Sequence, residues 1–174
     1  FTLVSDTKRY YPYDGLASHV IGFTGTDNQG LTGVELEYDN YLKGSSGRLV
    51  TAKDAAGSEM PFDYERLIDP EDGLNVVLTI DENIQRIADK YLEQAIEENK
   101  LGNGACCIVM NSKTGDILAM STKPDFNLND PFTVTNASDL EEISAVPEGE
   151  ERNKKYSEKL EKMWRNKAVV DAYE

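Results

Sequence analysis

The sequence has few of the side chains that carry enzyme chemistry: one histidine, two cysteines and one tryptophan among 174 residues. His19 has no cysteine or serine at a spacing that supports a nucleophile and its base. One histidine and two adjacent thiols supply too few ligands for a metal site, and no glycine-rich loop suited to a phosphate is present. The sequence therefore predicts no catalytic, cofactor-binding or metal-binding residue, and no cofactor.

Basic residues and long apolar runs are also scarce. The 18 basic residues are outnumbered by 32 acidic ones, and the net charge of −14 disfavours nucleic acid and anionic membranes as partners. We interpret the acidic excess as solvated surface; a glycosidase-like carboxylate pair stays open, but no pair is singled out. No run of 18 apolar residues exists, so no membrane span is predicted. Phe1 in place of an initiator methionine predicts an excerpt of a longer product.

One strongly periodic segment is present. Apolar residues recur at helical spacing along residues 84–96 and predict a helix with this buried face: Ile84, Ile87, Ala88, Tyr91, Leu92, Ala95 and Ile96. Asp81 is the predicted N-cap, and Gly102 is the predicted left-handed residue after the last turn. The predicted solvent face holds Gln85, Arg86, Asp89, Lys90, Glu93 and Glu97.

A predicted β-hairpin follows that helix. Residues 105–110 form an unbroken apolar run, which is typical of a strand covered on both faces, and residues 117–120 predict the returning strand. Gly115 permits the turn between them, and Pro124 ends the second strand. A helix laid on a buried hairpin predicts the start of an α+β domain.

The two cysteines, Cys106 and Cys107, are neighbours in the first predicted strand. Neighbouring side chains in a strand point to opposite faces, which makes a mutual disulfide unfavourable. Free cysteine behaves as a small hydrophobe, so both are predicted core residues.

Two groups of residues match signatures of one known family. The first group holds Leu78, Thr79, Ile80, Asp81, Ile84, Gln85, the run 114–120, Pro124, Phe126 and Asn127. The second group holds Arg9, Tyr11, Pro12, Ala17, His19 and Gly22. The first resembles the opening of the transpeptidase domain of class B penicillin-binding proteins, and the second resembles their non-catalytic region. On physical grounds alone, glycines such as Gly22 predict close backbone approaches or turns, and His19 is interpreted as structural.

The resemblance implies an α+β fold in two parts. A β-rich, dimerisation-type pedestal is expected over residues 1–72, and the first helix and hairpin of a transpeptidase domain over residues 73–174. Strands are predicted over residues 48–53 and 74–80, with a turn over residues 54–59.

A short helix is predicted within the pedestal. Thr32 and Glu35 have the form of a capping box that opens it, and Gly44 ends it. Tyr38 and Tyr41 on that helix are interpreted as core residues, with carbohydrate stacking as the alternative.

The last third of the chain predicts two more helices. Residues 138–141 form a second capping box, and residues 150–165 predict a charged surface helix. Its narrow apolar stripe is formed by Tyr156, Leu160, Met163 and Trp164. This segment is longer than the family requires.

The resemblance implies a monofunctional peptidoglycan D,D-transpeptidase of a cell-wall or spore-cortex pathway. In that family the serine of a Ser-x-x-Lys motif is acylated, and the lysine is its proton acceptor. The resemblance places that motif beyond Glu174, so the chain by itself is expected to be inactive and to bind no penicillin. Two literal matches are set aside: Ser5 with Lys8 is a chance spacing, and the Lys-Thr-Gly at 113–115 is a hairpin turn.

The resemblance also implies partners. The full-length parent is expected to bind peptidoglycan stem peptides and β-lactams, and to meet other cell-wall assembly proteins. It is expected at the extracytoplasmic face of the cell membrane, held by an N-terminal transmembrane helix outside this chain. The alternative is a non-enzymatic pedestal or scaffold module that binds those assembly proteins. If further strands follow Glu174, one apolar face of the hairpin should be uncovered here.

Overall fold

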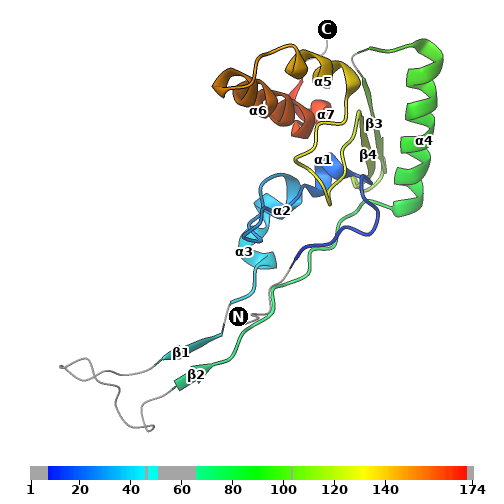
Figure 1. The fold of residues 1–174 in the computed structure, drawn as a ribbon. Helices are drawn as coiled ribbons and strands as arrows, with labels where there is room; N and C mark the ends of the chain where they lie inside the picture. The colour runs from blue at the N-terminus through cyan, green and yellow to red at the C-terminus, as the bar shows by residue number, and fades with distance from the viewer. Residues whose placement is uncertain (1–7, 46, 51–65, 103, 172–174) are drawn as a thin grey trace.

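The computed structural model describes residues 8–45, 47–50, 66–102 and 104–171. Its elements are α1 (Ser18–Ile21), α2 (Gly33–Glu37), α3 (Asp39–Leu42), β1 (Arg48–Val50), β2 (Arg66–Ile68), α4 (Glu82–Asn99), β3 (Ala105–Met110), β4 (Ile117–Lys123), α5 (Ala137–Ser144), α6 (Glu150–Trp164) and α7 (Lys167–Val170). The chain is elongated (Figure 1): α4 to α7 and the β3–β4 hairpin surround α1 at one end, and β1 and β2 extend away at the other. This mixture of helices and small sheets confirms the expected α+β fold.

Helix α4 confirms the helix predicted from the periodic segment, but its predicted buried face is wrong at Ile87 and Tyr91, which are 57% and 61% exposed because the hairpin covers only part of that face. It begins directly after Asp81, whose carboxylate accepts hydrogen bonds from the backbone N–H groups of Asn83 and Ile84 at 2.9 and 3.0 Å. The predicted end is wrong, because the left-handed residue is Lys100, with φ of 51°, and not Gly102. Lys100 donates its backbone N–H to the last turn of α4, so the chain leaves the helix two residues before the glycine.

β3 and β4 form the predicted antiparallel hairpin. Ala105 pairs with Lys123 and Ile108 with Met120, with one register shift near the turn. α4 covers one face of this hairpin (Figure 1). The expectation of a strand covered on both faces is wrong in this structure, because Ile108 and Met110 are 46% and 56% exposed. Burial therefore alternates along β3, as it does in a sheet with one solvated face.

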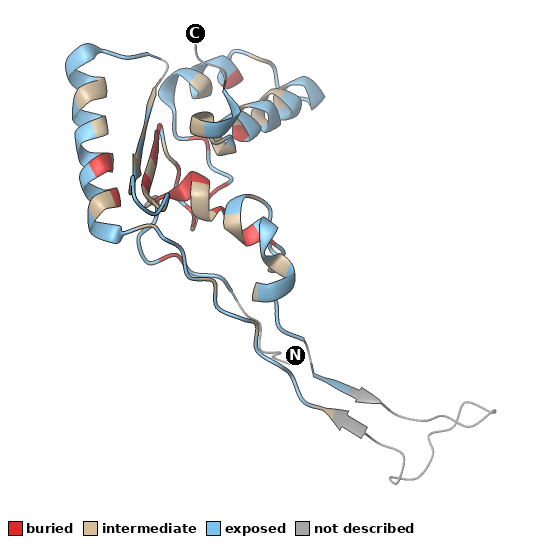
Figure 2. Ribbon diagram, turned by 180° about the vertical axis from the view of Figure 1, so that it is seen from behind, coloured by how far each residue is buried: buried red, intermediate tan, exposed pale blue. Residues whose placement is uncertain are grey.

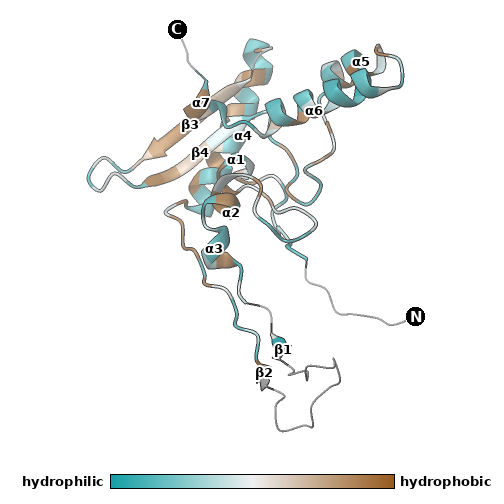
Figure 3. Ribbon diagram, turned by 90° about the vertical axis from the view of Figure 1, so that its left-hand side faces the viewer, coloured by the Kyte–Doolittle hydropathy of each residue, from teal (hydrophilic) through white to brown (hydrophobic). Residues whose placement is uncertain are grey.

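The face of the hairpin away from α4 is called the open face here, and its β3 residues are Cys106, Ile108 and Met110. Figure 3 shows apolar residues along β3 and β4 beside the more hydrophilic α4 and α6. Cys106 is exposed and Cys107 is half-buried, so the interpretation of Cys106 as a core residue is wrong. The predicted uncovered apolar face is confirmed in part: Ile108 and Met110 are exposed, while α7 packs against the hairpin.

The pedestal strands are confirmed in part. β1 lies within the predicted strand 48–53 and pairs antiparallel with β2, with Arg48 opposite Ile68. The rest of that strand and the predicted turn at 54–59 lie outside the described residues. Residues 74–80 form no strand and pair with none in the described part of the chain, so the strand predicted there is wrong. Their apolar residues favour extended backbone, but only a neighbouring strand makes a sheet.

The predicted pedestal helix is two short helices, α2 and α3, that meet at Tyr38. The capping box is wrong, because the Thr32 side chain caps nothing and Glu35 pairs with Arg9 instead. Tyr38 and Tyr41 are 41% and 58% exposed, which overturns their interpretation as core residues. Their rings lie against each other with centroids 6.2 Å apart. Carbohydrate stacking stays an untested alternative.

Two glycines let α1 and α2 approach closely. A Cβ on Gly22 would lie 1.9 Å from the Thr32 carbonyl oxygen, and a Cβ on Gly33 would lie 2.6 Å from the Val20 carbonyl oxygen. Both glycines also have positive φ, 73° and 59°. The close backbone approach predicted at Gly22 is confirmed.

The apolar core joins residues from opposite ends of the sequence. Figure 2 marks the buried residues along the chain, including those of α1, α4 and β4. One buried cluster consists of Tyr11, Phe23, Phe126 and Leu128. A second consists of Val134, Ile143 and Leu160. Met163 and Trp164 at the end of α6 pack against both clusters, so the stripe predicted for this helix is confirmed and its docking site is identified. The pedestal region and the hairpin region therefore share one core.

The capping box predicted at residues 138–141 is wrong, because the N-cap of helix α5 lies two residues before Ser138. This N-cap is Asn136, whose side-chain oxygen accepts from the backbone N–H of Ser138 at 3.0 Å. Within the described ranges, no helix has both the length and the apolar character needed to cross a membrane.

Candidate functional site

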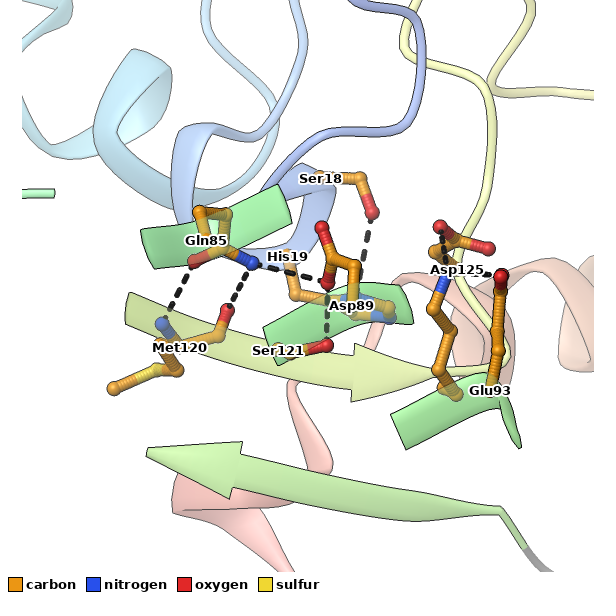
Figure 4. Close-up of polar contacts among 9 residues, drawn as sticks. Ser18, His19, Gln85, Asp89, Glu93, Met120, Ser121 and Asp125 are labelled. Atoms are coloured by element: carbon orange, nitrogen blue, oxygen red, sulfur yellow. Dashed lines mark hydrogen bonds and ion pairs between the residues drawn. The ribbon is translucent and has the colours of Figure 1, made fainter. Parts of the chain in front are cut away.

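A layer of polar side chains lies between α4 and β4, and we call it the polar layer: Gln85, Asp89, Glu93, Ser121 and Lys123. Figure 4 shows this layer with its neighbours. The sequence pattern assigned Gln85, Asp89 and Glu93 to the solvent face of the helix. That assignment is wrong for Gln85, which is fully buried, and for Asp89, which is half-buried.

Gln85 pairs with the backbone of β4. Its side-chain oxygen accepts from the Met120 backbone N–H at 2.8 Å, and its amide nitrogen donates to the Met120 carbonyl at 3.3 Å. The same nitrogen donates to Asp89 at 3.1 Å. One amide side chain thus satisfies both backbone groups of a strand residue, as a neighbouring strand would.

Asp89 and Lys123 complete the polar layer. Ser121 donates a hydrogen bond from its hydroxyl to Asp89. The Lys123 ammonium, 8% exposed, lies 2.6 Å from a Glu93 oxygen and 2.7 Å from an Asp125 oxygen. Burial acts to lower the pKa of Lys123, but the hydrogen bonds and charges of these two carboxylates outweigh it and the pKa is raised. Lys123 is therefore charged and doubly paired.

Ser18 and His19 of α1 lie beside the polar layer (Figure 4). His19 Nε2 is 3.0 Å from the Met163 carbonyl oxygen, and a carbonyl only accepts, so Nε2 carries a proton and donates. Burial lowers the pKa of His19 below its ordinary 6.5, although the Met163 hydrogen bond opposes that shift. Neutral His19 then accepts from the Ser18 hydroxyl at Nδ1, at 3.4 Å. The interpretation of His19 as a satisfied structural histidine is confirmed.

Another ion pair links two parts of the pedestal. Arg9 Nε lies 2.7 Å from an oxygen of Glu35, which is buried. Nearby, the Tyr11 hydroxyl accepts from the Thr24 backbone N–H at 3.1 Å. Burial raises the pKa of Tyr11, and the negative charge of Glu35 adds to that rise. Arg9 belongs to the second group of residues that match the family's signatures, and the structure gives it a partner that sequence spacing did not identify.

These groups hold elements together and leave no room for a ligand. The gap between α1 and the polar layer has no volume for even one water molecule. In the described part of the chain, no three potential metal ligands lie together. The Lys-Thr-Gly at 113–115 lies in the β3–β4 turn, where Thr114 bonds to Asp116 at 2.6 Å and Gly115 has φ of 81°, which confirms its structural role. Ser5 lies outside the described residues.

Comparison with known proteins assigns the family. A family model described as the penicillin-binding protein dimerisation domain matches residues 1–78. Stage V sporulation protein D of Bacillus subtilis is 42% identical over 125 residues, which are 72% of this chain and 19% of that protein. This chain belongs to the class B penicillin-binding proteins.

Solved structures of penicillin-binding proteins share the fold. Penicillin-binding protein 3 of Mycobacterium tuberculosis, complexed with aztreonam, is 28% identical, with a TM-score of 0.55 over 70% of this chain and 23% of that one. The Helicobacter pylori complex between PBP2 and MreC gives 27% identity and a TM-score of 0.52 over 78% of this chain and 26% of its match. The chain thus spans only 19 to 26% of the length of these relatives.

Within this penicillin-binding protein, the polar layer is what sequence analysis missed. Gln85 was quoted in the transpeptidase signature, but helical periodicity alone places it beside the apolar face and not on it. Gln85 could have been recognised from its position next to Ile84 and Ala88 on the helix face that packs against the hairpin. No periodicity identifies its partner Met120, which is 35 residues away.

Proposed function

We propose that the whole protein to which this chain belongs is a peptidoglycan D,D-transpeptidase that crosslinks stem peptides through a serine acyl-enzyme. The observation that supports this most is the 42% identity to stage V sporulation protein D across 72% of the chain. Relatives named as peptidoglycan D,D-transpeptidases at 34 to 35% identity support the same reaction class.

The proposed chemistry is acyl transfer. A serine of a Ser-x-x-Lys motif following Glu174 attacks the carbonyl of the D-alanyl-D-alanine bond, the terminal D-alanine leaves, and the amine of a second stem peptide takes the acyl group. β-Lactams acylate the same serine. The chain itself contributes the pedestal and the opening helix and hairpin, with the boundary placed near residue 72, and carries none of the reacting groups.

The proposed cellular setting follows from the relatives. Cell-wall assembly proteins are proposed partners, supported by the Helicobacter pylori complex of PBP2 with MreC. The extracytoplasmic face of the cell membrane is the proposed location, and a sporulation role is supported by the name of the Bacillus subtilis relative. The acidic charge of −14 argues against nucleic acid as a partner.

Fluorescent-penicillin labelling tests the proposal. The chain is compared with a form extended through the next few hundred residues of its gene, and adducts are mapped by trypsin digestion. We expect label only on the long form, on the serine of the first Ser-x-x-Lys past Glu174. Changing that serine to alanine, or adding unlabelled penicillin first, should abolish the label.

The second candidate function is a non-enzymatic scaffold. It is favoured specifically by the PBP2–MreC complex, in which a related protein binds another protein. If the long form takes no label and its gene encodes no Ser-x-x-Lys motif there, the scaffold replaces the enzyme.

A further inference from the structure

The C-terminal end of α6 is capped by a residue from the other end of the chain. The last four carbonyls of a helix have no partner within it, and Met163 is the second-last residue of α6. Its carbonyl accepts from His19 Nε2 at 3.0 Å, across 144 residues of sequence. A histidine side chain is well suited to this capping role. The pedestal helix α1 thereby contacts the last turn of α6.

The next residue of α6 is also held by the pedestal region. The Trp164 ring lies 5.0 Å, centroid to centroid, from that of Phe23, which is fully buried. The Trp164 indole N–H donates to the Pro131 carbonyl at 2.7 Å. Ring packing and a directional hydrogen bond together leave this side chain a single position.

Two residues after Trp164, the chain is held by hydrogen bonds to β4. The Asn166 amide donates to Met120 Sδ at 3.4 Å, and its oxygen accepts from the Thr122 hydroxyl at 3.4 Å. The same oxygen accepts from the Ala168 backbone N–H at 3.1 Å and so caps α7. α7 lies along the β3–β4 hairpin (Figure 1). Residues 163–166 therefore bridge a contact made by the pedestal and a contact made by the sheet.

We propose that His19 is a positioning residue: by capping α6 it sets the path of residues 165–171, and through them the chain that follows. This rests on the proposed function, in which the nucleophile comes shortly after Glu174. The pedestal then acts on acylation through a hydrogen bond, without contacting the substrate.

The alternative is that His19 only fills the core. Its ring packs edge-on against Phe126, with centroids 5.1 Å apart, so both roles are built into one side chain. Two substitutions separate them. His19→Gln keeps a nitrogen donor at nearly the same reach, whereas His19→Phe keeps the ring and removes the donor.

The experiment uses the long form and two readouts. The first is the rate constant for acylation by fluorescent penicillin, and the second is amide hydrogen exchange of residues 165–171. For His19→Phe we expect acylation slower by about fivefold, the size of one net hydrogen bond, together with faster exchange of residues 165–171. For His19→Gln we expect both readouts close to those of the wild type.

Tyr156→Phe is the matched control. It removes the hydrogen bond from the Tyr156 hydroxyl to the Phe132 carbonyl, 2.8 Å long, from the middle of α6. We expect neither readout to change. If His19→Phe fails to fold, His19→Asn takes its place, because its shorter amide stops short of the Met163 carbonyl, and the same two changes are expected.

The outcomes separate this inference from the proposed function. An unlabelled wild-type long form refutes the transpeptidase, and faster exchange in His19→Phe but not in His19→Gln still supports the positioning role. A labelled wild type with unchanged acylation and exchange in His19→Phe overturns the inference and leaves the transpeptidase standing. Equal losses in His19→Phe and His19→Gln also overturn it, because the donor is then not the cause.

Discussion

The apolar core and the polar layer connect different parts of the molecule by different means: the core joins the pedestal region to α6 and to residues just after β4, and the polar layer joins α4 to β4. In the core, Phe23 packs its ring against Phe126 and Trp164, at 5.9 and 5.0 Å between centroids. In the polar layer, Gln85 makes directed hydrogen bonds to the backbone of Met120. Phe23 and Gln85, the residues at the centres of these two contacts, are both fully buried.

The apolar core and the polar layer differ in how strictly each contact depends on the identity of its residues. Apolar packing depends on burial and shape, so many aromatic or aliphatic side chains serve it. A buried amide that pairs with backbone groups depends on both partners, because an unpaired buried donor or acceptor is costly. A second case has the same form: the Asn129 side chain accepts from the Tyr11 backbone N–H at 3.0 Å and donates to its carbonyl at 2.8 Å.

The largest expected effect is in the apolar core. Phe23→Ala removes a fully buried ring and should lower the free energy of unfolding by about 3–5 kcal/mol, measured by urea denaturation. Tyr10→Ala is the control, because Tyr10 is 73% exposed, and a change within about 0.5 kcal/mol is expected. Equal effects of the two substitutions would mean that the cluster around Phe23 is not the centre of the fold.

A smaller effect is expected in the polar layer. Gln85→Leu keeps the volume and helix propensity but leaves the Met120 N–H and carbonyl unpaired, so it should destabilise the chain by about 1–3 kcal/mol. Gln94→Leu, an exposed position on the same helix, should change stability by less than about 0.5 kcal/mol. A neutral Gln85→Leu in urea denaturation would show that packing, and not pairing, joins α4 to β4.

The smallest expected effect concerns pH. Burial lowers the pKa of His19 in the folded chain, so the unfolded chain takes up the proton first as pH falls through about 6.5. The wild type should therefore lose stability relative to His19→Gln below that pH, until the folded His19 also titrates. Asp125 acts against this shift, and Lys167 and Lys123 act with it. The check is the difference in Tm between the two proteins across pH 5–8; a constant difference contradicts the prediction.

The sequence was sufficient where one local rule decides the outcome. Asp81 caps α4 because its carboxylate can bond only the first free amides, and Gly115 takes the turn because it has no Cβ. The same local rules were wrong where another group competed, whether far away in the sequence or only two residues away. Glu35 left its predicted capping box for Arg9, 26 residues away, and Asn136 took the cap of α5 from Ser138.

Sequence by itself thus determined the α+β elements, the hairpin and its turn, and, through the quoted signatures, the family. Periodicity and turn chemistry act over a few neighbouring residues, so they can be recognised from the sequence alone. Only tertiary structure decided that Gln85 is buried, that Ile108 is exposed and that His19 caps α6. Each of these depends on which surface arrives from elsewhere in the chain, and burial and hydrogen-bond partners exist only once that surface is in place.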